Sequence, residues 1–117
     1  MNKIKIGIPH NSIYLNLYKI YFEKLDFDVV ESVEGSYNKY IENINDNILS
    51  LKNKCDYIIF PKYKTQNITN DYNCNFIIHE IDNDYEKFIQ YISDKFYIDK
   101  KVGQLAYNEA IIKYLSK

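Results

Sequence analysis

Arginine is missing from this chain, whose fifteen basic residues are all lysine. Without a guanidinium group the chain has no bidentate donor for phosphate or guanine. The formal net charge is −1, so there is also no excess of positive charge to attract a phosphate backbone. These absences exclude the usual nucleic-acid-binding classes, and we expect no nucleic acid among the partners.

Long hydrophobic runs and glycine are scarce as well. The longest apolar runs span four or five residues, whereas a membrane-spanning helix needs about 20. We therefore expect no membrane association. With three glycines in the whole chain, no glycine-rich loop can cradle a phosphate chain, which excludes the common nucleotide-binding fingerprints.

Cysteine is limited to Cys55 and Cys74, 19 positions apart. Two thiols at this spacing are typical of free cysteines in a reducing compartment, and we expect a cytoplasmic protein. The length of 117 residues, with 46% hydrophobic and 26% charged residues, fits one globular domain over residues 1–117.

Hydrophobic periodicity predicts alternating strands and helices. Strands are expected over residues 3–8, 27–30, 55–60 and 76–78, and helices over 12–25, 37–54, 83–96 and 99–115. The run 55–60 is continuously apolar towards its end, which favours a strand in the middle of the sheet. The order predicts an α/β fold: a Rossmann-like three-layer sandwich with a small, mostly parallel sheet of about four strands.

Three features of these elements refine the prediction. The helix 37–54 has a polar face that includes Asp46 and Asn47, and Asp99 can cap the last helix. Residues 62–75 form a long polar connection without periodicity, and such loops are usually functional or mobile. The last helix carries several large apolar side chains, namely Val102, Leu105, Ile112 and Leu115, together with Ala106.

The candidate ligand site follows from the fold class. In an open parallel sheet, ligands bind beyond the carboxyl ends of the strands, where helix amino termini present unpaired amides. His10, Asn11 and Ser12 follow the first strand, and Lys62 follows the third. We expect a small anion, either a phosphate or a carboxylate, at the Asn11 amides with Lys62 as its counter-charge. The alternative is a plain helix cap at Asn11 or Ser12.

Catalytic residues are not assigned. His10 is the best candidate for proton chemistry because imidazole titrates near neutral pH, but the sequence offers it no paired nucleophile or carboxylate.

Five short stretches occur in a characteristic order: Lys5–Pro9, Tyr21–Phe27, Asp56–Pro61, Tyr72–Cys74 and Ala106–Ala110. In that order they resemble a shortened relative of the 2-hydroxyacyl-CoA dehydratase family, specifically its acyl-CoA dehydratase activase-related members. The resemblance implies a Rossmann-like lobe and, in fuller members, an iron–sulfur cluster held by cysteines from separate loops. Only Cys74 falls at a family cysteine position, whereas a cluster needs about four thiolates.

Three functional hypotheses remain open. The first is a trimmed, non-catalytic accessory or regulatory domain that acts through a protein partner or a small anionic ligand. The second is an iron–sulfur enzyme subunit of the dehydratase type, in which Cys74 contributes to a metal cluster shared across a homodimer. The third is a flavodoxin-like ligand-binding domain unrelated to the family.

Overall fold

The computed structural model describes residues 3–9, 15–32, 44–61, 68, 72–79 and 85–116. Within them the chain forms four strands and four helices in the order β-α-β-α-β-β-α-α. These are β1 (Lys5–Ile8), α1 (Leu15–Lys24), β2 (Asp28–Glu31), α2 (Ile44–Leu51), β3 (Tyr57–Pro61), β4 (Phe76–His79), α3 (Tyr85–Phe96) and α4 (Lys100–Leu115).

The strands form one parallel sheet in the order β2-β1-β3-β4. This confirms the predicted parallel α/β fold, and the order matches the first four strands of the flavodoxin-like order 2-1-3-4-5. The apolar run that predicted a central strand is β3, which lies between β1 and β4. Ile58, Ile59 and Phe60 are at most 1% exposed, because helices cover both faces of this strand.

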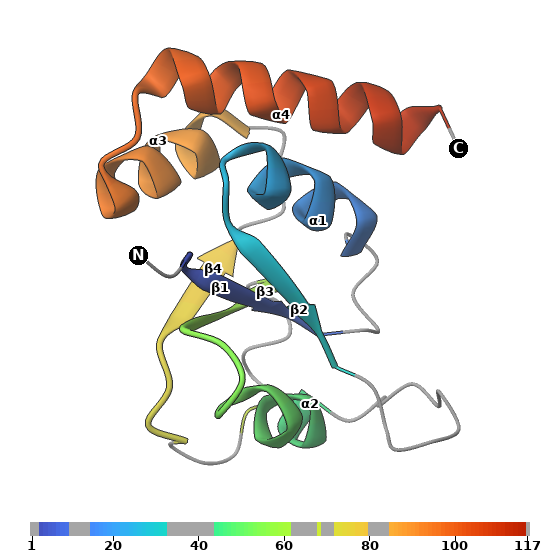
Figure 1. The fold of residues 1–117 in the computed structure, drawn as a ribbon, viewed down its shortest axis with the longest axis vertical. Helices are drawn as coiled ribbons and strands as arrows, with labels where there is room; N and C mark the ends of the chain where they lie inside the picture. Colours follow the sequence, from blue (N-terminus) through green and yellow to red (C-terminus); the bar gives the residue numbers. More distant parts are fainter. Residues whose placement is uncertain are drawn as a thin grey trace.

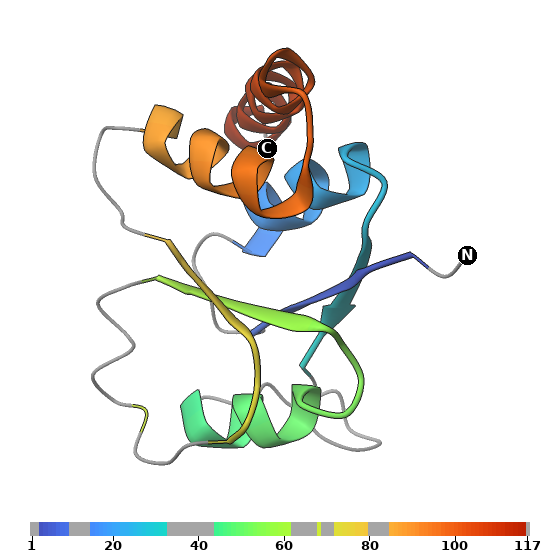
Figure 2. The same cartoon turned by 90° about the vertical axis from the view of Figure 1, so that its left-hand side faces the viewer.

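Helices lie on both faces of the sheet, as Figures 1 and 2 show. α1 and α3 cover one face, where Ile6, Ile8, Ile59 and Ile77 join the larger hydrophobic cluster. α2 covers the other face, where Ile48 and Leu51 pack with Ile58, Phe60 and Tyr72 in a second cluster. The predicted three-layer arrangement is therefore present.

α4 adds a layer that the sequence did not predict. It packs on α1 and α3 rather than on the sheet, and it forms the outermost element on that side (Figure 1). The salt bridge from Lys24 Nζ to Glu109 Oε2, 2.6 Å long, ties α1 to α4.

Two predicted helix boundaries are confirmed. The first helix, predicted to end at residue 25, ends at Lys24, and Asp26 two residues later has a left-handed φ of 70°. Asp99 caps α4, because its Oδ1 accepts hydrogen bonds from the amides of Lys101 at 2.8 Å and Val102 at 3.3 Å. The predicted caps at Asn11 and Ser12 lie outside the described residues. The predicted helical residues 37–43 and the start of the predicted helix 83–96 do as well.

The structure differs from the sequence prediction in the polar face of α2. Asn47, predicted to face solvent, is fully buried, whereas Leu49 on the same helix is 54% exposed. The reason is a partner from a distant strand end, described below.

Among the described residues, none of the helices has the length and apolar character needed to span a bilayer.

Candidate functional site

The strand order defines where a ligand site is expected. β2 lies next to β1 on one side of the sheet, and the strands that follow in the chain, β3 and β4, lie on the other side of β1. The direction in which strands are added therefore reverses between β1 and β3. In sheets of this type the crevice beyond the carboxyl ends of the two strands at the reversal is the usual ligand site. Those ends are Ile8 with Pro9, and Pro61.

The residues predicted to bind the anion follow these two strand ends directly in the sequence. His10, Asn11 and Ser12 come after Pro9, and Lys62 comes after Pro61. All four lie outside the described residues, so their common site stays a prediction. What the described residues establish is that the two strands preceding them are hydrogen-bonded neighbours.

A buried polar pair lies at the same edge of the sheet, one strand further out. Ser32 follows β2 and Asn47 lies in α2, and both are fully buried. The Ser32 hydroxyl donates to Asn47 Oδ1, and the Ser32 amide donates to the carbonyl of Ile8 at 3.4 Å. Because a buried polar group is costly unless it is hydrogen-bonded, this pair fixes α2 against the carboxyl end of the sheet.

Sequence reasoning missed this pair. Ser32 and Asn47 are 15 positions apart, and neither residue type indicates burial by itself. The one available signal was that Asn47 directly precedes Ile48, a core residue of α2.

Glu31, the last residue of β2, places a negative charge at this edge of the sheet. Lys19 of α1 pairs with it, with Nζ 3.4 Å from Oε1. This ion pair partly neutralises the carboxylate, so Glu31 opposes an anion at the neighbouring β1 and β3 ends less than an isolated carboxylate does.

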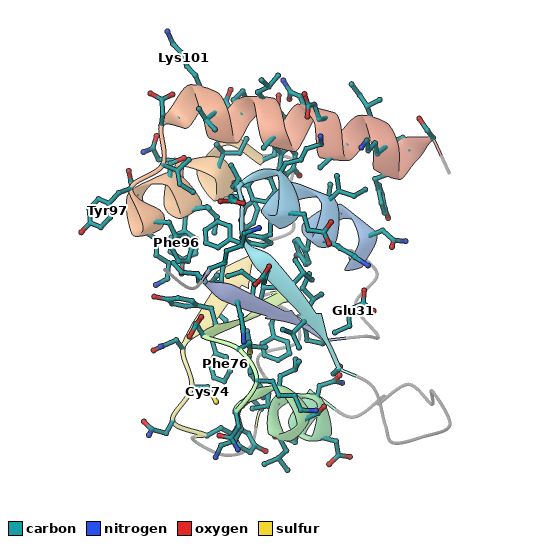
Figure 3. The ribbon with its side chains drawn as sticks, viewed as in Figure 1. Glu31, Cys74, Phe76, Phe96, Tyr97 and Lys101 are labelled. Atoms are coloured by element: carbon teal, nitrogen blue, oxygen red, sulfur yellow. The ribbon has the colours of Figure 1, made fainter. Side chains whose placement is uncertain are left out.

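The two cysteines lie at the opposite edge of the sheet. Cys55 precedes β3, and Cys74 precedes β4. Cys74 therefore does not belong to the edge that carries the predicted anion site (Figure 3). Both thiols are free and partly buried, and both pack against the hydrophobic cluster beneath α2.

Each cysteine thiol donates a hydrogen bond to a main-chain carbonyl. Cys55 Sγ donates to the carbonyl of Leu51 at 3.1 Å, and Cys74 Sγ donates to the carbonyl of Tyr72 at 3.3 Å. Burial, helped by the nearby Cys74, raises the pKa of the Cys55 thiol to about 11. The surroundings of Cys55 therefore favour its protonated thiol.

No group of three or more histidine, cysteine, aspartate or glutamate side chains is arranged to hold a metal within the described part of the chain. Metal binding by Cys74 and the shared iron–sulfur cluster stay predictions.

Described residues line, among other hollows, two of similar size on the surface. One, of about 420 Å³, lies at the amino ends of the strands between Lys3, Asp56 and Asn75. Asp56 Oδ2 already accepts a hydrogen bond from the Lys5 amide at 2.8 Å. The other, of about 440 Å³, lies between the start of α3 and the second half of α4.

The hollow between α3 and α4 is the more apolar of the two. Tyr85 and Tyr107 line it with their rings stacked 5.4 Å apart, and Asn108, Ile111 and Ile112 complete its lining. Tyr85, at the start of α3, lines this hollow and is 43% exposed.

No protein-family model, no curated protein and no solved structure matches this chain.

Proposed function

We propose that this chain is a non-catalytic accessory or regulatory domain of the cytoplasm that binds a small anionic ligand beyond the carboxyl ends of β1 and β3. The observation that supports the proposal is the parallel order β2-β1-β3-β4, which reverses between these two strands. The sequence resemblance to the acyl-CoA dehydratase activase-related proteins agrees with such a domain, as a trimmed relative that has kept the α/β lobe.

The chemistry of the segments after β1 and β3 favours a small anion over a nucleotide. Asn11 and Ser12 are good helix-capping residues, and free amides at the start of a helix bind anions. Lys62 adds one positive charge next to the end of β3. A single lysine without a glycine-rich loop suits a carboxylate or one phosphate group rather than a pyrophosphate.

The experiment is a titration of the ¹⁵N-labelled chain with inorganic phosphate, and separately with acetate, followed by NMR. We expect the amide signals of Ile8, Ser32 and Phe60, near the carboxyl ends of their strands, to shift with ligand concentration. The amides of Lys5 and Tyr57, at the amino ends of β1 and β3, serve as internal controls and should not move.

Lysine variants sharpen this test. Lys62→Gln removes the counter-charge and should weaken binding about tenfold, as expected for the loss of a charged hydrogen bond. Lys54→Gln, which alters a lysine just before β3 at the opposite edge of the sheet, is the matched control and should leave binding unchanged. Shifts confined to the amino edge, or equal losses in both variants, would contradict the proposed site.

The alternative of an iron–sulfur subunit has its own measurement. Iron and acid-labile sulfide are determined in protein purified without oxygen, together with the visible absorption spectrum. Near-stoichiometric iron that is lost in Cys74→Ala would replace the accessory-domain proposal by the enzyme hypothesis. Colourless, iron-free protein is the result that the accessory-domain proposal expects.

A further inference from the structure

β4 is an open edge of the sheet. In the order β2-β1-β3-β4 it is hydrogen-bonded to β3 on one side. Among the described residues, no strand pairs with its other side, and Figure 2 looks onto this edge, with β4 drawn in front of β3. In the flavodoxin-like order 2-1-3-4-5, a fifth strand pairs with this side of the fourth.

The outward backbone groups of β4 belong to Phe76 and Ile78. The Ile58 amide donates to the Asn75 carbonyl at 2.9 Å, so residue 75 turns its backbone groups towards β3. Successive residues of a strand alternate in this direction, and Ile77 therefore also faces β3, whereas Phe76 and Ile78 face away from it. No described segment outside the sheet forms a backbone hydrogen bond with these two residues. Their amides and carbonyls can pair with one extended chain.

The two edges of the sheet differ in their protection. Exposed edges invite pairing with another chain, and many proteins prevent this with charged side chains on the edge strand. The edge strand β2 begins with Asp28 and ends with Glu31. β4 has the sequence Phe-Ile-Ile-His, without a lysine or a carboxylate, and the side chains of Phe76 and Ile78 are half-buried. β4 therefore has the features of an edge that receives a strand.

The flank of α3 that faces away from α4 carries Tyr91 and Lys95. α3 packs on α4 through Ile89 and Ser93, whose side chains lie against Gly103. At roughly 100° of rotation per residue, positions 91 and 95 lie on the opposite flank of the helix. Tyr91 is 38% exposed, so this flank is open to solvent.

Lys95 places a positive charge over the amino ends of β3 and β4. Its Nζ lies 5.0 Å from the centroid of the Tyr57 ring and 5.9 Å from that of the Tyr91 ring. Tyr57 is the first residue of β3, and by the register of the two strands it lies opposite Asn75, the residue before β4. Among the described residues, no carboxylate forms an ion pair with Lys95. An acidic side chain beside β4 would supply that partner.

We propose that the free edge of β4 binds an extended acidic segment of a partner protein, which adds a fifth strand to the sheet. The proposal is independent of the anion site. Side chains of the added strand alternate between the two faces of the sheet. Those on the α3 face meet Tyr91 and Lys95 and are acidic, whereas those on the α2 face lie beside Phe76 and Ile78 and are apolar. Backbone hydrogen bonds give such a complex its affinity, and the alternate side chains give it selectivity.

Charge complementarity favours a different protein over a second copy of this chain. If β4 of a second copy paired with β4, the added strand would be Phe-Ile-Ile-His, which has no carboxylate to place beside Lys95. A second copy is therefore an outcome that the tests below must distinguish.

Hydrogen exchange of the wild-type chain tests the open edge first. The Ile77 amide should exchange at least about 100-fold more slowly than the amides of Phe76 and Ile78, because it alone of the three is hydrogen-bonded within the sheet. Slow exchange at all three positions would mean that the edge is already covered, which overturns the proposal. If that protection rises with protein concentration, a second copy is the occupant.

The binding probe is a capped octapeptide in which glutamate alternates with valine. We expect a Kd on the order of 100 µM, with shifts and slower exchange at the amides of Phe76 and Ile78 and no change at the amides of β2. The same peptide with lysine in place of glutamate should bind at least about fivefold more weakly. Lys95→Glu should reverse this preference. Lys101→Glu is the matched control, because Lys101 of α4 points away from the body of the molecule (Figure 3), and it should leave the preference unchanged.

N-methylation of the probe separates strand addition from charge attraction alone. Methyl groups on one alternate set of amides, either those of the glutamates or those of the valines, should abolish binding, whereas methyl groups on the other set should be tolerated, because only one set faces β4. A parallel strand uses its glutamate amides, and an antiparallel strand uses its valine amides.

Three results would overturn the proposal. The first is a glutamate–valine peptide that does not bind. The second is equal binding of the two N-methylated forms. The third is a set of shifts at Ile8 and Ser32 in place of Phe76 and Ile78, which would assign the peptide carboxylates to the anion site at the carboxyl ends of the strands.

Discussion

Replacing Gly7 by alanine should destabilise the fold, because β1 passes unusually close to the turn that follows α2. A Cβ atom on Gly7 would lie 2.6 Å from Cys55 Sγ and 3.4 Å from Leu51 Cδ1. The second distance is an ordinary contact, whereas the first requires one of the two atoms to move. Gly7 is hydrogen-bonded into the sheet between β2 and β3, and Cys55 Sγ is held by the carbonyl of Leu51 at 3.1 Å. Neither the β1 backbone at Gly7 nor the Cys55 side chain can move away without weakening these hydrogen bonds.

The size of the effect follows from two opposing contributions. Overpacking in a filled core costs about 1–3 kcal/mol. Alanine also restricts the unfolded chain, which stabilises the fold by roughly 0.4–1 kcal/mol where the backbone tolerates it. The net expectation for Gly7→Ala is a loss of about 1–2 kcal/mol.

A double-mutant cycle isolates the contact with sulfur. In a Cys55→Ala background the sulfur is gone, so the new methyl group fills the space that it occupied. Gly7→Ala should then be neutral or stabilising, which corresponds to a coupling free energy of about 1–2 kcal/mol between the two positions.

Urea denaturation under reducing conditions measures the four proteins of the cycle. At a slope of roughly 1–2 kcal/mol per molar urea, the Gly7→Ala midpoint should fall by about 1 M with the slope unchanged. Equal effects of Gly7→Ala in the two backgrounds would refute the close contact between Gly7 and Cys55 as its cause.

Three further predictions concern buried polar groups. Ser32→Ala should lower the unfolding free energy by about 1–3 kcal/mol, because the buried side-chain amide of Asn47 in α2 loses one hydrogen bond. Ser116→Ala, at the exposed end of α4, is the control and should change stability in urea little. Tyr21→Phe should leave stability unchanged or raise it by about 1 kcal/mol, because the buried Tyr21 hydroxyl has no hydrogen-bond partner among the described residues. The exposed residue Tyr97 supplies the control, Tyr97→Phe. If urea denaturation shows that Tyr21→Phe loses more than about 1 kcal/mol relative to this control, the Tyr21 hydroxyl makes a hydrogen bond in the folded protein. Burial raises the pKa of Cys55 from 9.0 to about 11, so the folded state holds the thiol proton more tightly and stability should fall as pH rises between these values. Cys55→Ala should flatten that fall in thermal melts between pH 8 and pH 11, and an unchanged slope would show that other groups cause it.

The sequence by itself determined the elements of the fold and their order. Alternation in residues 3–8 marked β1, and the continuous apolar run ending at Phe60 marked an interior strand, because a strand covered on both faces has no polar side to alternate with. Asp99 marked the start of the last helix through local capping chemistry that needs no distant partner. When helices connect successive strands and the connections are right-handed, few sheet topologies other than a parallel sheet are possible.

Tertiary structure alone decided which side chains are buried where the local pattern was ambiguous. Asn47 has the residue type of a solvent-facing position, and it is buried because Ser32, 15 positions away, supplies a hydrogen bond. The alternation in β1 does not predict a glycine at position 7, yet a glycine is needed there because the turn that holds Cys55 passes close to it.

In α4, tertiary structure decided which apolar side chains stay exposed. Its apolar residues are spread around the whole helix, so only the packing of its small face on α1 and α3 determined that Val102, Leu105, Ile112 and Leu115 remain on the surface. Burial of this kind depends on contacts between residues far apart in the chain, and local periodicity carries no information about them.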